Sequence, residues 1–164
     1  MNMYSKNILI HSSPEYVFTY MDNNGNIGVN ITTSSMTMMG SKLELKQLSK
    51  NAMVLNSKFR WTGRMMGFTM DFTVVVSKWI KDKEKVWEII GKAKMIILEW
   101  YQMRFVILPE RENTKAELSI AYTNPKNIFF KIIAFFLAPF YANWCLDNIL
   151  QDSKKRLETN QNSK

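Results

Sequence analysis

The residues best suited to chemistry in this chain are few and lie far apart in the sequence. His11 is the single histidine and Cys145 the single cysteine. A Ser-His-Asp or Cys-His nucleophile needs several partners in one place, and a zinc site needs several such ligands together. We therefore expect no catalytic residue, no metal ligand and no cofactor. His11 is expected to be structural or exposed, and Cys145 to be a small core residue.

A polar pair in the segment Met95–Leu108, which we predict to be one long strand, is more informative. Glu99 and Arg104 are five residues apart, so strict alternation places one of them on the inner face. An inward Arg104 would need an anionic or carbonyl partner, which a ligand could supply. Alternatively, a bulge turns both outward, or only the Arg104 stem is covered. Gln102 and Tyr122 are the next polar candidates, although a buried tyrosine usually bonds a backbone acceptor.

The segments that carry these residues have a hydrophobic period of two, which predicts strands. After a first strand at Tyr4–Ile10, the predicted strands lie near residues 43–46, 53–61, 68–77, 87–89, 95–108 and 117–122. Turn-like segments lie at 49–51, 63–67, 82–85, 91–92 and 109–114. Short loops between six successive strands predict an antiparallel meander.

A short helix is predicted directly after the first strand. Ser13 can cap it, and Pro14 suits the first helical position, where a missing N–H costs nothing. Glu15 favours the positive end of the helix, and residues 23–25 end it. We expect one or two such helices between the first and second strands.

A long final helix is predicted from the cap and proline at 124–125 through Leu157, with a kink at Pro139. Its first half, residues 128–141, is apolar nearly all round. This half therefore needs cover on several sides.

The chain resembles the START-like, Bet v 1-like (SRPBCC) superfamily, especially its polyketide cyclase/dehydrase branch. The matching residues are Ser12–Phe18, Trp61–Arg64 with Gly67, Tyr122 with Pro125, and Trp144–Glu158. The resemblance implies an α+β helix-grip fold, in which a seven-stranded curved antiparallel sheet wraps around the long C-terminal helix. It also implies a ligand cavity between sheet and helix, but no reaction. We expect a single domain at residues 1–158 and a frayed tail at 159–164.

Large apolar side chains are expected to meet in that interior. The candidate ligand-binding residues are Phe59, Trp61, Met70, Phe72, Trp87, Trp100, Arg104, Tyr122, Leu137, Phe140 and Trp144. The alternative is that they simply fill a solid core. Met36, Met38 and Met39 are candidates for a mobile entrance.

The net charge of +8 raises the question of an anionic partner. The cations are scattered and no nucleic-acid-binding motif accompanies them, so we do not expect nucleic acid to be the partner. The lone cysteine and the absence of a secretory signal predict a cytoplasmic protein. Oligomeric state is left open.

Three functions follow as hypotheses. The first is binding or transport of a hydrophobic small molecule such as a lipid, polyketide or quinone. The second is a cyclase- or dehydrase-like enzyme using Arg104, Tyr122 or Glu99. The third is a peripheral membrane or protein-interaction module. Residues 128–146 are long enough to span a bilayer, but Lys131, Pro139 and Asn143 interrupt the apolar run. Exposed Phe129, Phe130 and Phe135 beside Lys131 would suit lipid contact. We expect the first function, with a gripped rather than a transmembrane helix.

Overall fold

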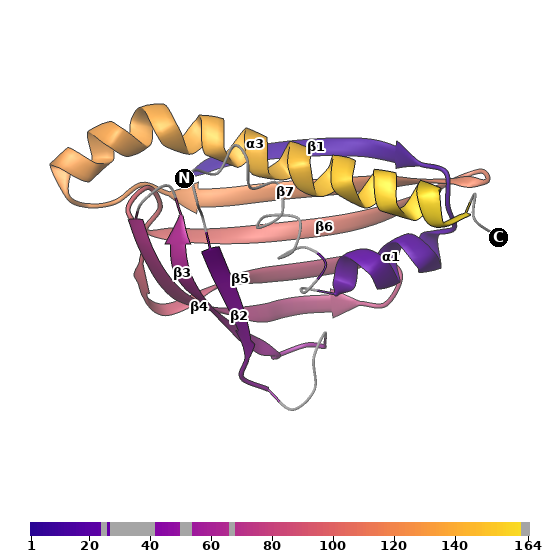
Figure 1. Ribbon diagram of the computed structural model, residues 1–164, viewed down its shortest axis with the longest axis horizontal. Coiled ribbons are helices and arrows are strands. Elements are labelled where there is room, and N and C mark those ends of the chain that lie inside the picture. Colours follow the sequence, from indigo (N-terminus) through magenta and orange to yellow (C-terminus); the bar gives the residue numbers. More distant parts are fainter. Residues whose placement is uncertain (24–25, 27–41, 50–53, 66–67, 162–164) are drawn as a thin grey trace.

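The computed structural model describes residues 1–23, 26, 42–49, 54–65 and 68–161 (Figure 1). The expected entrance residues Met36, Met38 and Met39 lie outside these ranges. In chain order the elements are β1 (Asn2–Ile10), α1 (Pro14–Asp22), β2 (Lys42–Gln47), β3 (Lys58–Met65), β4 (Phe68–Ile80), β5 (Glu84–Lys94), β6 (Trp100–Glu110), β7 (Asn113–Thr123) and α3 (Ile128–Gln161).

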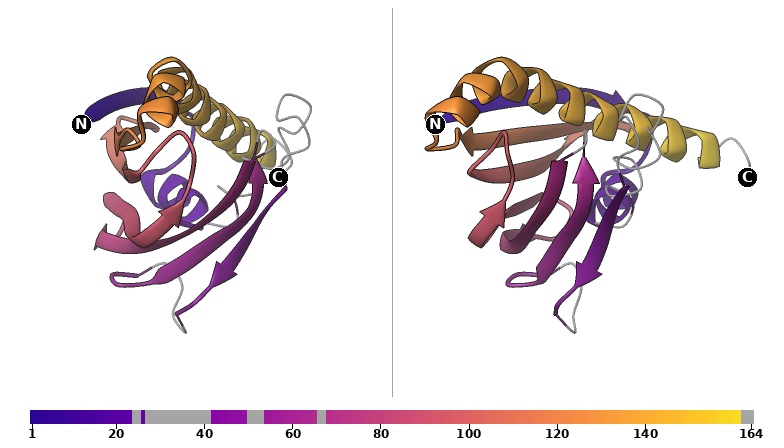
Figure 2. Two further views of the ribbon diagram at one scale, coloured as in Figure 1. Left: turned by 90° about the vertical axis from the view of Figure 1, so that its left-hand side faces the viewer. Right: turned by 60° about the vertical axis from the view of Figure 1, so that its left-hand side comes forward.

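The strands form one seven-stranded antiparallel sheet in the order β1-β7-β6-β5-β4-β3-β2. The meander from β2 to β7 is therefore confirmed, and β1 joins its far edge beside β7. The sheet is strongly curved, and α3 lies along β1 and β7 while α1 contacts β6 and β7 (Figure 2). This is the predicted helix-grip architecture. The side of the sheet that faces the two helices is called the inner face below.

The start of α1 confirms the predicted cap. The Ser13 side chain accepts a hydrogen bond from the backbone N–H of Tyr16, and Pro14 is the first helical residue. Val17, Phe18 and Met21 form the buried face of this helix. Asp22 is buried as well, which its charge did not suggest.

Several predicted strand ends are wrong because turns lie elsewhere. Residues 54–57 form a turn rather than part of β3, with Asn56 at a φ of 66°. The predicted turn at 91–92 lies inside β5, where the strand has a β-bulge. Thr73 pairs with Ile90 and Asp71 with Lys94, so four residues of β5 span the length of two residues of β4. Gly91 adopts the positive φ of 70° at this bulge. The turn instead occupies residues 95–99, so β6 begins at Trp100 and not at Met95.

The long final helix begins at Ile128, later than predicted, because Asn127 is its cap. The side-chain oxygen of Asn127 accepts hydrogen bonds from the N–H groups of Phe129 and Phe130. The helix continues through Pro139 to Gln161, so its last turn includes residues that we expected to be frayed. The predicted tail residues 162–164 lie outside the described ranges.

Candidate functional site

The inner face of the sheet carries most of the predicted aromatic residues. The strand registers place Trp61 opposite Phe72 on neighbouring strands, and Tyr122 opposite Tyr101. The deeply buried members of the predicted set, at most 9% exposed, are Phe59, Trp61, Phe72, Trp87 and Tyr122. Met70 and Trp100 are partly buried against the same core. The predicted inward positions are confirmed for all of these residues except Trp100, which alternates in β6 with the outward-facing Gln102 and Arg104. Contact of these residues with a ligand stays a prediction.

Tyr122 places a polar group in this apolar interior. The residue is fully buried, its ring stacks on Tyr4 with centroids 6.1 Å apart, and its hydroxyl lacks a hydrogen-bond partner of good geometry within the described residues. Burial, followed by the electrostatic effect of the nearby Tyr4 phenol and a poorly aligned hydrogen bond with that phenol, raises the pKa of Tyr122 to about 12, so the hydroxyl stays protonated at neutral pH. It can therefore donate a hydrogen bond to a carbonyl or carboxylate of an apolar ligand.

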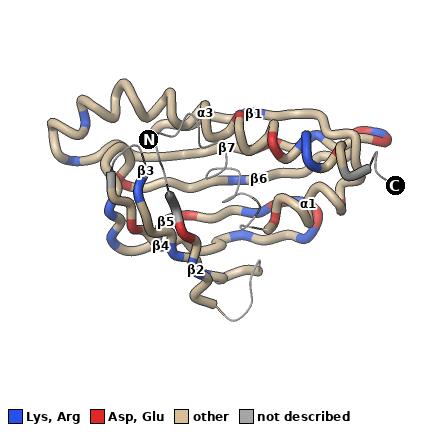
Figure 3. The backbone as a smooth tube through the Cα atoms, in the orientation of Figure 1, with Lys and Arg blue, Asp and Glu red and all other residues tan. Residues whose placement is uncertain are grey.

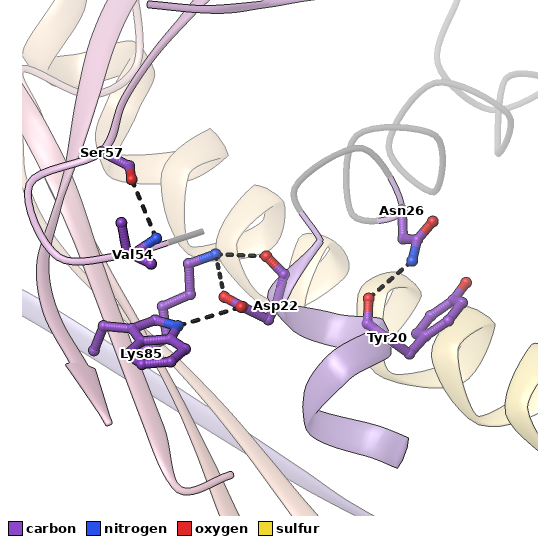
Figure 4. Close-up of polar contacts among 7 residues, drawn as sticks. Tyr20, Asp22, Asn26, Val54, Ser57 and Lys85 are labelled. Carbon is purple, nitrogen blue, oxygen red and sulfur yellow. Dashed lines mark hydrogen bonds and ion pairs between the residues drawn. The ribbon is translucent and has the colours of Figure 1, made fainter. Parts of the chain in front are cut away.

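A buried ion pair joins the end of α1 to the sheet (Figure 4). Lys85 is fully buried, and its Nζ lies 2.7 Å from Asp22 Oδ1 and 2.6 Å from the Asp22 backbone oxygen. The indole N–H of Trp79 donates to Asp22 Oδ2 at 3.2 Å. Burial lowers the pKa of Lys85, and the neighbouring carboxylate of Asp22 opposes that shift.

Sequence reasoning missed this pair because it assigned residues 82–85 to an exposed turn. Lys85 is instead the second residue of β5 and shares the inner face with Trp87 and Ile89. Their spacing of two was a signal that could have found it. Asp22 is distant in sequence and gave no comparable signal.

The expectation that either Glu99 or Arg104 faces the interior is wrong, and Arg104, a candidate ligand-binding residue, points outward. Its side chain is 44% exposed on the outer face, and its Nε lies 2.6 Å from Glu84 Oε1. The hydrogen bond from Lys78, and after it the one from Arg104, holds the pKa of Glu84 below its ordinary value. Gln102 also faces outward and donates to Glu88. These contacts form a polar network on the side of the sheet away from α3.

The conflict between Glu99 and Arg104 disappears because only one of them is in a strand. Glu99 lies in the turn before β6, is exposed, and its carboxylate is 3.1 Å from Lys126 Nζ. Alternation therefore constrains Arg104 alone, and both charges reach solvent. Neither of these two groups is placed to act on a ligand in the interior.

The predicted inward positions of Leu137 and Phe140 are also wrong, since both are exposed, Phe140 to 68%. The buried stripe on this half of α3 consists of Ala134, Ala138 and Ala142, spaced one turn apart. Small side chains let the helix backbone approach the sheet closely, which turns the large side chains outward. Trp144 is half-buried, with its ring stacked on Tyr141 at 6.2 Å.

A second cluster comprises the buried Tyr101 and Cys145 with the partly buried Tyr141, the last lying one turn before Cys145 on α3. Burial raises the pKa of Cys145 to about 12, and it also raises the pKa of both tyrosines. The thiol is therefore protonated at neutral pH, as expected for a core cysteine and not for a nucleophile.

These raised pKa values predict a loss of stability in alkali. Above the ordinary thiol pKa of 9.0, the unfolded chain releases the Cys145 proton while the folded chain keeps it, so stability falls as the pH rises towards about 12. Cys145→Ala should flatten this slope by up to about 1.4 kcal/mol per pH unit. Urea unfolding at fixed pH values measures the slope. Tyr16→Phe, at an exposed tyrosine, is the control and should leave it unchanged; superimposable slopes for all three proteins would contradict the prediction.

His11 occupies a structural position at the end of β1. It is exposed, its Nδ1 is 2.8 Å from Asn113 Oδ1, and its backbone N–H donates to Glu158 on α3. Over the described part of the chain, no three His, Cys, Asp or Glu side chains gather as metal ligands.

Comparison with known proteins supports the fold through structure and not through sequence. No protein-family model and no curated protein matches the sequence. The fold is similar to that of the protein TTHA0849 from Thermus thermophilus (TM-score 0.72, 14% identity, 96% of this chain and 98% of that one). It is also similar to a point mutant of norcoclaurine synthase from Thalictrum, solved with a transition-state analogue (TM-score 0.68, 10% identity, 98% and 96% covered). A third similar structure is Ara h 8.0201 (TM-score 0.60, 9% identity, 93% and 97% covered).

These full-length matches establish the fold. The chain has the helix-grip fold of Bet v 1-like proteins, as its sequence resemblance implied. At these identities the likeness concerns the fold alone.

Proposed function

We propose that this protein binds a hydrophobic small molecule, such as a lipid, polyketide or quinone, between the inner face of the sheet and α3. The observation that carries the proposal is the buried Tyr122 hydroxyl, which has no well-oriented hydrogen-bond partner among described residues and lies in an aromatic interior. Buried polar groups are nearly always hydrogen-bonded, so such a hydroxyl suits the polar end of an otherwise apolar ligand.

The arrangement of the surrounding elements supports the same proposal. α3 lies along β1 and β7, at one side of the curved sheet, and its buried stripe there is made of alanines. Large inner-face side chains come from β3, β4 and β5, including Trp61, Phe72 and Trp87, and also from β6 and β7, including Tyr101 and Tyr122. An apolar ligand could therefore be held by aromatic side chains on the sheet with a single hydroxyl fixing its orientation. We place this activity in the cytoplasm, where a lone cysteine stays reduced.

An enzymatic function has less support in this chain. Glu99 and Arg104, two of the three groups considered for proton transfer, face solvent and take part in ion pairs. Tyr122 remains, with a pKa of about 12 that suits hydrogen bonding better than proton abstraction at neutral pH. Norcoclaurine synthase is an enzyme of this fold, but fold alone does not carry a reaction from one protein to another.

The proposal is tested by titrating the protein with the fluorescent fatty acid cis-parinaric acid and following tryptophan-to-probe energy transfer. We expect saturable binding at one site. Tyr122→Phe keeps the ring and removes the hydroxyl, so affinity should fall roughly five- to tenfold, as expected for one lost hydrogen bond. Tyr16→Phe, at an exposed tyrosine, should bind the probe as the wild type does.

Two results would count against the proposal. One is the absence of saturable binding together with native mass spectra that show no bound lipid, polyketide or quinone after incubation. The other is equal affinity in Tyr122→Phe and wild-type protein, which would remove the role given to the hydroxyl.

A further inference from the structure

The exposed side of the first half of α3 is far more apolar than a solvated helix surface. Its large side chains are between 58% and 72% exposed. The term outer face of α3 is used below for these exposed side chains: Ile128, Phe129, Ile132, Phe135, Phe136 and Phe140. Their spacing places them on one continuous side of the helix, and four of them, with Lys131, line a shallow groove. Contiguous apolar patches of this kind mark binding surfaces.

This helix differs from an ordinary core helix of a soluble protein. By length and composition α3 could cross a membrane, and only 22% of its most apolar 18-residue stretch is buried. A core helix with such a composition would be mostly covered. Its opposite side, however, is held against the sheet by Ala134, Ala138 and Ala142, followed by Leu146 and Ile149. A helix held against a folded sheet from Ala134 onward can offer one face to a bilayer but cannot cross it as an isolated span.

The charge around the outer face identifies its partner. Lys131 borders the groove, Lys126 precedes the helix, and α3 has no acidic residue before Asp147. Figure 3 shows this half of the helix without any acidic segment. The ion pair between Lys126 and Glu99 is solvent-exposed, with the Lys126 side chain 89% exposed. Exposed aromatic and aliphatic side chains bordered by lysines are the pattern of helices that lie in the interface of anionic membranes.

A second copy of this chain is a poorer occupant. In a two-fold dimer the outer face would meet itself, and Lys131 of each copy would approach the other without a nearby acidic residue from this part of α3. Anionic lipid headgroups supply the opposite charge.

We propose that the outer face of α3 docks this protein onto anionic phospholipid membranes, with the aromatic side chains entering the headgroup region and Lys131 contacting phosphate. This inference stands apart from the proposed ligand binding, because it uses only side chains on the opposite side of α3 from the interior. A membrane-docked helix-grip domain would hold its interior beside a lipid surface.

The test is co-flotation of the purified full chain with vesicles of phosphatidylcholine, with or without phosphatidylglycerol. We expect the wild type to float with the anionic vesicles and much less with neutral ones, and added salt to weaken the difference. The double variant Phe135→Ser, Phe136→Ser should lower partitioning at least about tenfold. Leu108→Ser, at an exposed leucine of β6, is the matched control and should float as the wild type does.

The charge contribution has its own control pair. Lys131→Glu should lower partitioning onto anionic vesicles by roughly fivefold or more, whereas Lys81→Glu, in the exposed turn before β5, should have a much smaller effect. Tyr122→Phe should float normally, so failure of ligand binding and failure of membrane docking are separable. Circular dichroism verifies that each variant is folded.

Three outcomes would overturn the inference. The wild type fails to float with either vesicle type, or the Phe135→Ser, Phe136→Ser variant floats as well as wild type. In the third, the protein binds neither vesicle type, sedimentation velocity without lipid shows a dimer, and the double variant is a monomer. This result would assign the outer face to a second copy.

Discussion

Lys85→Met should lower the free energy of unfolding by about 3–5 kcal/mol, the effect of breaking a buried ion pair by removing one partner. The substitution keeps an apolar side chain of similar length but leaves the Asp22 carboxylate buried without its cation. The Trp79 indole N–H still donates to that carboxylate, but one neutral donor does not replace a cation at 2.7 Å. Because α1 ends at Asp22, the junction of this helix with the sheet should loosen. Urea denaturation followed by circular dichroism measures the loss.

A double-mutant cycle separates the ion pair from simple packing. Asp22→Leu combined with Lys85→Met removes both charges, so the double variant should be more stable than the sum of the single losses predicts, by a few kcal/mol. If Lys85→Met alone does not fold, recovery of folding in the double variant shows equally that removal of the second charge relieves the loss caused by the first. Lys83→Met, at an exposed lysine two residues earlier, should change stability by no more than about 0.5 kcal/mol. Strict additivity, or a loss at Lys85 no larger than at Lys83, would contradict the role of the pair.

Ala138→Leu should destabilise the protein by about 1–3 kcal/mol, because it adds three carbon atoms at a fully buried position between α3 and the sheet. Backbone separation there is set by alanines at 134, 138 and 142, so a larger side chain must push the helix away or adopt a strained rotamer. Thermal unfolding followed by circular dichroism measures the change.

The neighbouring positions give the opposite expectation. Leu137→Ala and Phe140→Ala remove large side chains that are already exposed, so each should change stability by less than about 1 kcal/mol. If instead these two truncations destabilise strongly and Ala138→Leu is tolerated, α3 is rotated so that its large side chains face the sheet. The three variants together therefore determine which side of the helix is buried.

Much of the architecture could be predicted from local patterns. Alternation identified the inner positions of Phe59, Trp61 and Phe72, because neighbouring residues on a strand must point to opposite faces. The cap at Ser13 and the proline after it located the start of α1, since these residues satisfy the backbone at a helix terminus. Strand ends were predicted less well: the bulge at Gly91 depends on pairing with β4, a contact between strands and not a local preference.

The sequence by itself determined the order of the elements, the antiparallel meander and the apolar inner face, because hydrophobic periodicity and helix capping act over a few residues. The tertiary structure alone decided which side of α3 is buried, since a helix half that is apolar all round carries no preference for one face. In the folded protein the alanines of α3 pack against the sheet, and Phe135 and Phe136 are exposed. It also decided that Lys85 is buried, because only folding brings Asp22 to a cation 63 residues away along the chain.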